Sequence, residues 1–438
     1  LPGYTKEQDH RRHARGQNGM RLRTEQRAYI DETGRLVLPP DIVARLGLVP
    51  GTPVFLDEEA RGLRLRQPIT RLARVYVEPT SRCNLACRTC IRNVWDEPLG
   101  TMSAATYARI LDGLRAFPLP LTVFFGGFGE PLSHPRIIEM IEAAKALGAS
   151  VELITNGTLL NETMARSLIA AGLDRLWVSL DGARPESYTD VRLGATLPTV
   201  LANLERFRDL RQPWRHLAPE IGIAFVAMQR NVGDLPDLLR IARQLGAARM
   251  MISNVLPHTA EMREEILYHR ALSNDDYLPS PRLPDLYLPR MDSARLATPA
   301  LYEAIAGAWN LIYAGGDGDE DAASSRCPFI ESGATAIAWD GSVSPCLPLL
   351  HSSDSFLHGL GRYARRYVIG SIHEHSLAEL WQQPEYVAFR ERVQAFDFAP
   401  CTICDGCALS EDNEADCYGG EFPTCGGCLW AQGIVQCP

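Results

Sequence analysis

The sequence lacks both a membrane-spanning segment and a secretory signal. No apolar run approaches the roughly 18 residues that a membrane helix needs. Residues 1–19 are polar, rich in His and Arg, and have no apolar core of the kind that directs export. We interpret them as a disordered leader or an added tail, with Met20 as a native start. These absences favour a cytoplasmic protein with no membrane contact.

The sequence also lacks an excess of positive charge. Its formal net charge is −9 at pH 7, whereas proteins that bind nucleic acids normally carry a basic face. The chain has 438 residues, enough for about two to four domains with a large buried interior. We therefore expect a multidomain globular protein for which DNA is not a partner.

Cysteine is abundant. The chain has twelve cysteines, and without an export signal they are not expected to form disulfide bonds. Many stand in short spacings such as Cys-x2-Cys, which suit metal binding better than pairing with one another. Zinc sites and iron–sulfur clusters both use such spacings, so the cysteine count alone leaves both open.

The first three cysteines form the pattern Cys-x3-Cys-x2-Cys, directly after a strand predicted over residues 75–78. Three thiolates can hold three irons of a [4Fe–4S] cube and leave the fourth iron without a protein ligand. Zinc usually recruits a fourth Cys or His, and this loop contains no His. The predicted ligands of a cluster with one open iron are therefore Cys83, Cys87 and Cys90.

Residues 69–255 alternate between apolar strand-like runs and amphipathic helical runs. This alternation is typical of repeated βα units around a parallel sheet. Six strands are expected, over residues 75–78, 121–125, 150–155, 175–180, 221–227 and 249–253. Six units predict an α/β fold with a partial, TIM-like (β/α)6 barrel, whose functional groups lie at the carboxyl ends of the strands.

These features together resemble the radical SAM (S-adenosylmethionine) superfamily, from about residue 75 to the C-terminus. The resemblance implies a [4Fe–4S] cluster that binds SAM at its open iron and cleaves it reductively to a 5′-deoxyadenosyl radical. This radical then abstracts a hydrogen atom from the substrate. A low-potential electron donor of the ferredoxin or flavodoxin type is implied as a partner. We assign no catalytic side chain.

The SAM contacts that the resemblance implies lie in four motifs, GGFGEP, TNG, SLDG and DVR. The Gly-rich turn would receive the amino group of SAM. Ser179 and Asp181 would contact the ribose, and Arg192 would clamp the carboxylate. Each polar residue could instead cap a helix or shape a turn. The predicted cofactor-binding residues are Gly126, Gly127, Gly129, Glu130, Pro131, Asn156, Ser179, Asp181 and Arg192.

Residues 256–325 are irregular and rich in Pro, and we interpret them as a connector. One helix is expected within it, over residues 299–313. The connector separates the predicted barrel from a cysteine-rich C-terminal module over residues 326–438.

The C-terminal module opens with the spacing Cys-x13-Gly-x4-Cys and resembles the SPASM domain, which carries auxiliary clusters in peptide- and protein-modifying radical SAM enzymes. Two auxiliary [4Fe–4S] clusters would need eight thiolates, so one cysteine is spare. The later spacings depart from the usual SPASM pattern, which leaves the ligand assignment and the number of clusters open, with zinc as the alternative. The candidate ligands are Cys327, Cys346, Cys401, Cys404, Cys407, Cys417, Cys425, Cys428 and Cys437.

Residues 20–68 resemble the AbrB/MazE swapped-hairpin family through GRLVLPPDIVARLGL and the turn PGTPV. The pattern predicts a turn at Thr33-Gly34, a strand over residues 35–38, a helix over residues 41–46 and two further strands. Such units interleave in pairs, which implies a homodimer. Relatives often bind DNA, but Arg and acidic side chains nearly balance here, which favours dimerisation or substrate recruitment.

The domain order, the segment CIRNVWDEPLG and the ending PTCGGCLWAQGIVQCP resemble the radical SAM maturases of tungsten-cofactor aldehyde ferredoxin oxidoreductases. The resemblance implies anaerobic maturation of such an enzyme, with a protein, peptide or pterin-cofactor substrate. Two alternatives are a peptide- or protein-modifying SPASM maturase and an AbrB-type DNA-binding redox regulator. A sulfatase maturase is disfavoured because Leu347 stands where an Asp is expected. His351 could be a ligand or an acid, but scattered histidines are usually at the surface, where we expect it, and we expect Trp430 in the core.

Overall fold

The structure is a computed structural model. It describes residues 28–40, 42–43, 48, 54, 56–59, 62–65, 68–211, 218–268, 285–288, 310–313, 327–357, 360–402 and 407–438. The chain divides into two compact units, residues 1–52 and residues 53–438.

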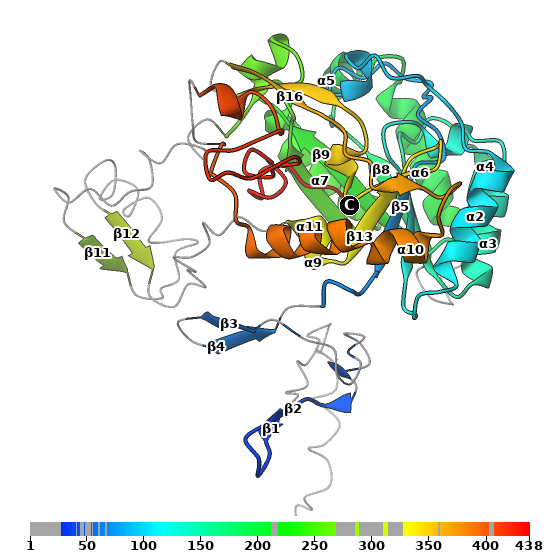
Figure 1. Cartoon of the computed structure of the whole chain (residues 1–438). Coiled ribbons are helices and arrows are strands. Elements are labelled where there is room, and N and C mark those ends of the chain that lie inside the picture. The colour runs from blue at the N-terminus through cyan, green and yellow to red at the C-terminus, as the bar shows by residue number, and fades with distance from the viewer. Residues whose placement is uncertain are drawn as a thin grey trace, which may run out of the picture. The chain divides into compact units, whose positions relative to one another are not determined.

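A nine-stranded sheet forms the centre of the larger unit, in the order β10, β9, β8, β7, β6, β5, β13, β14, β17 (Figure 1). Six of these strands are parallel and follow one another in chain order, which confirms the predicted βα units. They are β5 (Arg74–Val77), β6 (Thr122–Phe125), β7 (Ser150–Thr155), β8 (Arg175–Ser179), β9 (Glu220–Ala227) and β10 (Arg249–Asn254). Each predicted strand agrees with the structure to within one residue at either end.

Helices follow the parallel strands and cover the outside of the sheet (Figure 1). They are α2 (Ala104–Leu114), α3 (Ile137–Ala146), α4 (Glu162–Ala170), α5 (Pro185–Val191), α6 (Leu197–Leu210) and α7 (Leu235–Gln244). Side chains cap two of their N-termini, since Ser103 accepts a hydrogen bond from the Thr106 amide and Asn161 from the Met164 amide. These caps fix where each helix begins after its strand.

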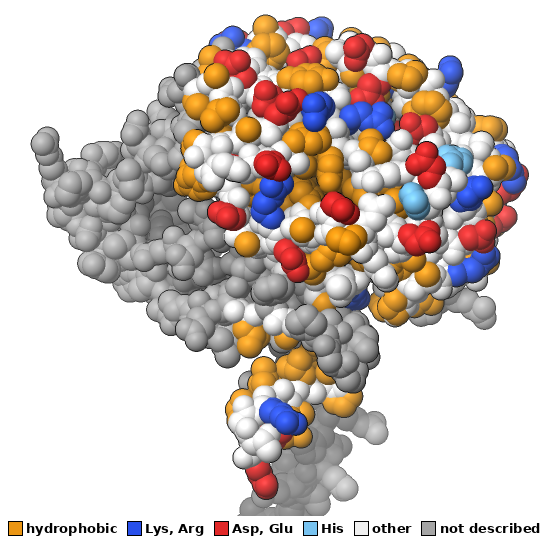
Figure 2. Space-filling view, in the orientation of Figure 1, with side chains coloured by type: hydrophobic (Ala, Val, Ile, Leu, Met, Phe, Trp, Pro, Cys, Tyr) orange, Lys and Arg blue, Asp and Glu red, His pale blue; other side chains and the backbone are white. Residues whose placement is uncertain are grey.

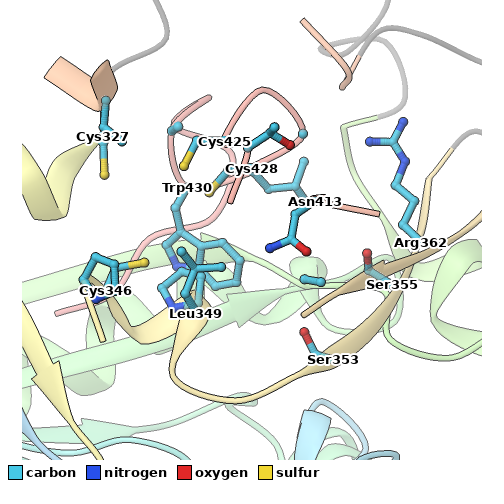
Figure 3. Close-up of a pocket in the computed structure, with 18 of the residues that line it drawn as sticks. Cys327, Cys346, Leu349, Ser353, Ser355, Arg362, Asn413, Cys425, Cys428 and Trp430 are labelled. Atoms are coloured by element: carbon cyan, nitrogen blue, oxygen red, sulfur yellow. The ribbon is translucent and has the colours of Figure 1, made fainter. Parts of the chain in front are cut away.

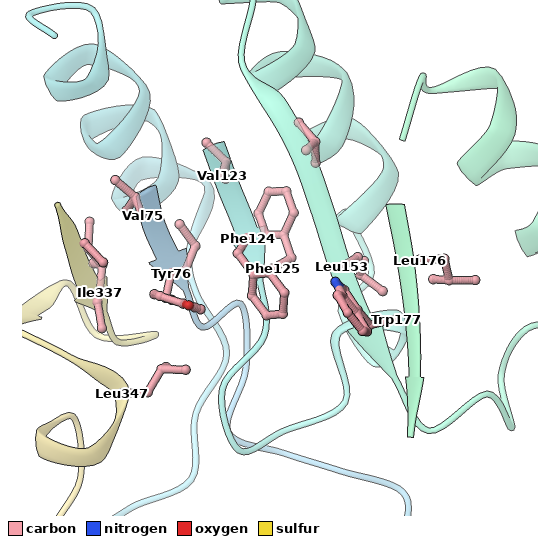
Figure 4. Close-up of a cluster of buried hydrophobic side chains, with 14 of the residues drawn as sticks. Val75, Tyr76, Val123, Phe124, Phe125, Leu153, Leu176, Trp177, Ile337 and Leu347 are labelled. Carbon is pink, nitrogen blue, oxygen red and sulfur yellow. The ribbon is translucent and has the colours of Figure 1, made fainter. Parts of the chain in front are cut away.

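The core lies between this sheet and its helices, and on the inner side of the sheet. Neighbouring strands contribute Val75, Val123 and Leu153, each fully buried, and Phe124 lies beside Tyr76 with ring centroids 5.1 Å apart (Figure 4). Both faces of the sheet are covered, which explains why its strands read as continuous apolar runs rather than as an alternation.

The C-terminal region continues the barrel sheet. Strand β13 (Ala334–Ile337) pairs in parallel with β5, and β14 (Ser342–Ser344) and β17 (Gly370–Ser371) follow it antiparallel. The sequence predicted a separate module from residue 326, whereas the structure joins it to the barrel through backbone hydrogen bonds. The remaining elements are the hairpin of β15 (Ser353–Leu357) and β16 (Leu360–Ala364) and the helices α9 (Pro328–Glu331), α10 (Leu377–Gln382) and α11 (Pro384–Ala395).

Six short 3-10 helices occur in the described loops. They are η1 (Ile91–Asn93), η2 (Pro131–Ser133), η3 (Val232–Asp234), η4 (Glu261–Glu265), η8 (Leu347–Leu349) and η9 (Ala408–Ser410). Three of them, η1, η2 and η8, follow segments that line the cavities described below.

Ion pairs close the amino end of the parallel sheet. Glu152 on β7 is 6% exposed and lies 3.2 Å from Arg74 and 2.6 Å from Arg175. Its carboxylate also accepts a hydrogen bond of 3.0 Å from the indole of Trp177. Because this end is filled by paired charges, the carboxyl end is left for ligands.

The last residues of the chain run across the concave side of the sheet, where Figure 1 marks the C-terminal end. Asn254 at the end of β10 donates a hydrogen bond of 2.9 Å to the carbonyl of Ile434. The Gln436 amide donates to the hydroxyl of Ser253 at 2.9 Å, and the Tyr76 hydroxyl on β5 donates to the carbonyl of Pro438 at 3.1 Å. The tail thereby connects the first and last parallel strands of the partial barrel.

In the N-terminal unit, β1 (Tyr29–Ile30) and β2 (Leu36–Val37) form an antiparallel pair. The Asp31 carboxylate accepts hydrogen bonds from the amides of Thr33 and Arg35, and Gly34 has a φ of 82°. This confirms the predicted turn. Of the predicted helix over residues 41–46, Ile42 and Val43 are described and are helical.

The hairpin of β3 (Leu56–Glu59) and β4 (Gly62–Leu65), in the larger unit, matches the two further strands predicted there. The unit boundary at residues 52 and 53 falls inside the predicted domain over residues 20–68, whose extent and AbrB-like identity stay predictions.

The helix predicted over residues 299–313 is wrong at its end. Residues Asn310–Tyr313 form strand β12, which pairs in parallel with β11 (Asp285–Leu288). The sequence Asn-Leu-Ile-Tyr is rich in strand formers, and pairing with β11 outweighs the helical periodicity of the longer segment. Residues 299–309, like residues 1–19, lie outside the described part of the chain.

Within the described ranges, no helix combines the length and the apolar character needed to cross a bilayer. On the face shown in Figure 2, Lys and Arg side chains of the described residues are interspersed with Asp and Glu. This mixed surface agrees with the net charge of −9.

Candidate functional site

The first three cysteines lie on a loop after β5 that is fastened to a neighbouring segment. The Ala86 amide donates to the carbonyl of Leu193 at 3.3 Å and the Arg88 amide to that of Val191 at 3.0 Å. These bonds resemble a short strand pairing and hold the loop at the carboxyl end of the sheet. All three thiols, those of Cys83, Cys87 and Cys90, are free of disulfide bonds and line one cavity, while their role as cluster ligands stays a prediction.

Hydrogen-bond donors approach two of these sulfur atoms. Arg192 Nη1 lies 3.8 Å from Cys87 Sγ, Asn156 Nδ2 lies 3.8 Å from Cys83 Sγ, and the Leu85 amide lies 3.4 Å from Cys83 Sγ. Burial raises the pKa of the Cys83 and Cys87 thiols. Such thiols become thiolates when they coordinate a metal, and donors to the sulfur then stabilise the negative charge and tune the reduction potential.

The Gly-rich turn forms one wall of the same cavity through Gly127, Phe128, Gly129 and Glu130. Gly127 has a φ of 124°, and a Cβ there would lie 2.8 Å from Glu78 Cγ. A Cβ on Gly129 would lie 2.0 Å from the backbone oxygen of Thr80, which cannot move aside. Both positions therefore need glycine, which lets the backbone line the cavity directly.

Glu130 is directed into the protein. Its carboxylate accepts hydrogen bonds from Thr155 Oγ1 at 2.7 Å, from the Asn156 amide at 2.8 Å and from the Leu132 amide at 3.0 Å. The residue is 2% exposed, and burial raises its pKa against the effect of these bonds. Glu130 thus holds the TNG segment, and with it Asn156, in place, while it also lines the cavity; its predicted contact with the cofactor stays a prediction.

Asp181 has a similar place behind the site. It is fully buried, and one of its carboxylate oxygens lies 2.6 Å from both Nε and Nη2 of Arg192. The other oxygen accepts the Val226 amide at 2.8 Å. Asp181 is not among the cavity-lining residues, so this geometry favours anchoring of Arg192 over the predicted ribose contact. Burial alone would lower the pKa of Arg192, but the charge and hydrogen bond of Asp181, together with the charges of Cys87 and Tyr188, outweigh it and raise this pKa.

The structure brings most of the predicted cofactor-binding residues together. Those that line the cavity are Gly127, Gly129, Glu130, Asn156, Ser179 and Arg192, whereas Gly126, Pro131 and Asp181 do not. The cavity has about 1140 Å³ of space, part of it open to solvent. Its residues fit a cluster with bound SAM. Three thiols line one wall, glycine backbone lines another, and the buried guanidinium of Arg192 lies beside Cys87 Sγ.

The sequence missed residues that close this cavity from the far side. They come from the end of β10, from η8 and the strand after it, and from the tail: Ser253, Asn254, Val255, Leu256, Pro348, Ser353, Trp430, Val435 and Gln436. No spacing or composition marks them, since only the path of the tail across the sheet brings them here.

A second cavity lies in the C-terminal region and encloses about 1000 Å³, part of it open to solvent. Four thiols line it, from Cys327, Cys346, Cys425 and Cys428 (Figure 3). Burial raises the pKa of Cys327 to about 12 and also raises the pKa of the other three thiols. Neither in this cavity nor in the rest of the described chain do three Cys, His, Asp or Glu side chains lie close enough together to hold a single metal ion. Four thiols around a larger space fit a fully ligated cube.

The other described C-terminal cysteines are not among the residues that line this cavity. Cys401, Cys407 and Cys417 are on the loops after α11, and Cys404 lies outside the described residues. Cys437 Sγ accepts a hydrogen bond of 3.1 Å from the Trp430 indole, and burial raises the pKa of Cys437 to about 11.

The two cavities share a wall. Leu256, Pro348, Ser353 and Trp430 line both of them. Trp430, expected in the core, is half-buried and lines both cavities; Figure 3 shows its side chain among those that line the second one. The three-thiol site and the four-thiol site are therefore neighbours.

Two family models match the chain. The model of the radical SAM superfamily matches residues 77–218, and that of the SPASM iron-sulfur cluster-binding domain matches residues 327–408. The first matched segment contains Cys83, Cys87 and Cys90, and the second contains Cys327, Cys346, Cys401, Cys404 and Cys407.

Individual proteins are similar over different lengths. The tungsten-containing aldehyde ferredoxin oxidoreductase cofactor-modifying protein of Pyrococcus furiosus is 32% identical over 368 residues, which cover 83% of this chain and 96% of that protein. The PqqA peptide cyclase of Gluconobacter oxydans is 28% identical over 181 residues, covering 41% of this chain and 48% of that protein. The crystal structure of Streptococcus suis SuiB bound to precursor peptide SuiA is 15% identical, with a TM-score of 0.49, and covers 78% of this chain and 72% of that one.

Proposed function

The chain belongs to the radical SAM family, as a member with a SPASM domain, and from this premise we propose that it matures a tungsten-containing aldehyde ferredoxin oxidoreductase. The observation that carries the proposal is the 32% identity to the cofactor-modifying protein, which extends over 96% of that protein. A match over 368 of the 438 residues is longer than either matched domain alone. The other reading from the sequence, a DNA-binding redox regulator, is overturned by membership of an enzyme family.

The radical SAM domain binds a [4Fe–4S] cluster and SAM, and the SPASM domain binds auxiliary iron–sulfur clusters. When bound and reduced, the first cluster supplies the electron that cleaves SAM to methionine and the 5′-deoxyadenosyl radical for hydrogen abstraction. Cys83, Cys87 and Cys90 would hold this cluster. Arg192, fixed by Asp181, would face the carboxylate of SAM.

The far wall of the cavity would protect the reactive intermediate. Leu256, Trp430 and Val435 place apolar surface opposite the thiols, and Val435 is 6% exposed. Exclusion of water from such a chamber prevents side reactions of a reactive species. Ser253 and Gln436, which are hydrogen-bonded to one another, fix the tail in this position.

The cysteine geometry supports an assignment of the auxiliary ligands. Four thiols surround the second cavity and would hold one auxiliary cluster: Cys327, Cys346, Cys425 and Cys428. A second auxiliary cluster would then use Cys401, Cys404, Cys407 and Cys417. This leaves Cys437, which is hydrogen-bonded to Trp430, as the spare thiol.

Iron analysis tests this assignment. The wild type, reconstituted without oxygen, is expected to hold about twelve irons per chain, and Cys346→Ala about eight, because a cube that loses one of four thiolates is no longer fully ligated. The matched control, Cys437→Ala, should retain about twelve. Iron and sulfide counts with Mössbauer spectra give the answer. Loss of about four irons in Cys437→Ala with full retention in Cys346→Ala would exchange the roles of the two residues.

The maturation role is tested with the partner enzyme. A tungsten-containing aldehyde ferredoxin oxidoreductase produced in a host without this chain is expected to have low aldehyde-oxidising activity and an altered cofactor by mass spectrometry. Co-expression of this chain should restore both, and co-expression of its Cys87→Ala variant should restore neither. Equal aldehyde-oxidising activity and equal cofactor mass without this chain, with it and with its Cys87→Ala variant would contradict the proposal.

A second candidate is modification of a peptide or protein. The similarity to a PqqA peptide cyclase over 181 residues favours it. In the co-expression experiment this candidate predicts an unchanged cofactor mass together with a changed mass of a peptide from the partner enzyme. The two substrate classes are thus separated by which molecule changes.

The proposal includes partners that the chemistry requires. Reduction of the first cluster needs a low-potential donor of the ferredoxin or flavodoxin type.

A homodimer through residues 20–68 is supported by apolar side chains on the first hairpin, since Tyr29 and Ile30 are each 63% exposed. A cytoplasmic location is part of the proposal, because the Cys-x2-Cys spacings suit metal binding and such clusters of cysteines escape disulfide formation in a reducing compartment.

A further inference from the structure

A histidine that the sequence placed at the surface is buried beside the SAM cavity. His351 is 3% exposed, so the surface prediction is wrong. Its Nδ1 lies 2.6 Å from Glu97 Oε2, and its Nε2 lies 3.0 Å from Glu78 Oε2. Both carboxylates are also withdrawn from solvent, with side-chain exposures of 0% for Glu78 and 13% for Glu97. An imidazole between two buried carboxylates is a costly arrangement unless it has a purpose or is fully paired.

One of the carboxylates supports the Gly-rich turn. Glu78 Oε1 accepts a hydrogen bond of 3.2 Å from the Phe128 amide. The same side chain fills the space where Gly127 has no Cβ. Gly127 and Phe128 both line the cavity, so Glu78 fixes the backbone of the turn from behind. The position of Glu78 depends in turn on His351.

Aromatic contacts hold the imidazole ring itself. The ring centroid of His351 lies 4.2 Å from that of Trp95 and 5.6 Å from that of Phe128. Trp95 and Phe128 also contact each other, with centroids 5.4 Å apart. The ring therefore has little freedom to turn away from either carboxylate.

His351 belongs to the C-terminal region, whereas the carboxylates that it contacts, those of Glu78 and Glu97, belong to the barrel region. It follows η8, which begins directly after Cys346, and the adjacent Ser352 amide donates to Glu97 Oε1 at 2.7 Å. The segment that carries an auxiliary-site thiol is thus attached to the turn of the SAM site through one buried side chain.

The ring must donate from both nitrogens, because a carboxylate only accepts, and an imidazole with two donors is the cation. Burial disfavours this charge, but the hydrogen bonds and charges of Glu78 and Glu97 outweigh it and raise the pKa of His351 to about 9. Among the described residues, Arg366 is the other charged group beside His351 and its two carboxylates. Its Nη1 lies 3.5 Å from Glu97 Oε2.

We propose that His351 is a positioning residue for SAM, which as an imidazolium fixes Glu78 and, through Glu78, the Gly127–Phe128 turn. The inference rests on the SAM site of this chain and does not depend on which substrate is modified. It also makes SAM binding sensitive to pH in a defined direction. Because the folded-state pKa of His351 is raised from 6.5 to about 9, its support is complete below pH 6.5 and is lost as the pH rises through about 9.

The test compares the affinity for SAM of anaerobically reconstituted wild type and His351→Gln. Binding is measured through the change that SAM causes in the electron paramagnetic resonance spectrum of the reduced cluster. His351→Gln can donate to only one carboxylate, and we expect its Kd for SAM to rise about 10- to 100-fold at pH 7 with unchanged iron content. The ratio of the two Kd values should fall toward one above pH 9. The matched control is His375→Gln, at an exposed position, which should bind like the wild type.

A second variant keeps the test decisive if His351→Gln does not fold. Glu97→Gln leaves the imidazole with one carboxylate, so the pH at which SAM affinity falls should move down from about 9. Wild-type affinity with no such fall between pH 7 and 10, or a His351→Gln variant with wild-type Kd, would overturn the inference. Because the readout is SAM binding, failure here is distinguishable from failure of the maturation proposal.

Discussion

Cys87→Ala is expected to lower the rate of 5′-deoxyadenosine formation at least about 1000-fold, which corresponds to about 4 kcal/mol of lost transition-state stabilisation. Cys87 is the middle thiol of the loop, is 7% exposed, and is the one that Arg192 approaches. Its removal leaves two thiolates for the first cluster, whereas the thiols around the second cavity are untouched. The measurement is chromatography of 5′-deoxyadenosine after anaerobic incubation with SAM and dithionite.

The control for this variant is Cys437→Ala, which removes a half-buried thiol outside both proposed ligand sets and should keep the rate near that of the wild type. Iron analysis in parallel should show that Cys87→Ala loses about four irons and keeps about eight. A Cys87→Ala protein that forms 5′-deoxyadenosine at the wild-type rate would show that this loop does not hold the SAM-cleaving cluster.

Asp181→Asn is expected to destabilise the protein by about 3 to 5 kcal/mol, because it removes one partner of a buried ion pair and leaves the other charge uncompensated. The pair is well withdrawn from water, with side-chain exposures of 12% for Arg192 and 0% for Asp181. Asn can still accept the Val226 amide that Asp181 accepts, so the substitution isolates the loss of charge. SAM binding should weaken as well, since Arg192 loses the group that orients it.

The matched control for Asp181→Asn is Asp237→Asn on α7. Asp237 lies 2.7 Å from Arg240, but both side chains are more than half exposed. Exposed pairs contribute about 0 to 1 kcal/mol, so this variant should unfold close to the wild type. Anaerobic urea unfolding of the three proteins gives the comparison. Coincident midpoints for Asp181→Asn and Asp237→Asn would contradict the role assigned to the buried pair.

The sequence was sufficient for the barrel and for the cluster loop. Each parallel strand is a short apolar run of strand formers between amphipathic helices, and this local pattern determines the element almost by itself. The loop cysteines are equally local, because seven positions separate Cys83 from Cys90. Contacts between residues that are close in the chain produce a regular spacing of residue types in the sequence.

What the sequence could not show depends on contacts between distant segments. His351 meets Glu78 across 273 positions, and Gln436 meets Ser253 across 183. The same reason explains why the sequence does not show that Asp181 forms a buried ion pair with Arg192. Side-chain direction at a strand end is decided by tertiary packing, which spacing does not encode.

The tail that crosses the concave side of the sheet has a consequence for biosynthesis. The cluster loop leaves the ribosome about 340 residues before Trp430 and the tail, a delay of roughly 20 to 70 s at ordinary rates of translation. During this interval the nascent chain has its three N-terminal thiols but not the wall that later covers them. A cluster inserted during this interval would enter an uncovered loop, and access would narrow once Trp430 and the tail have taken their places.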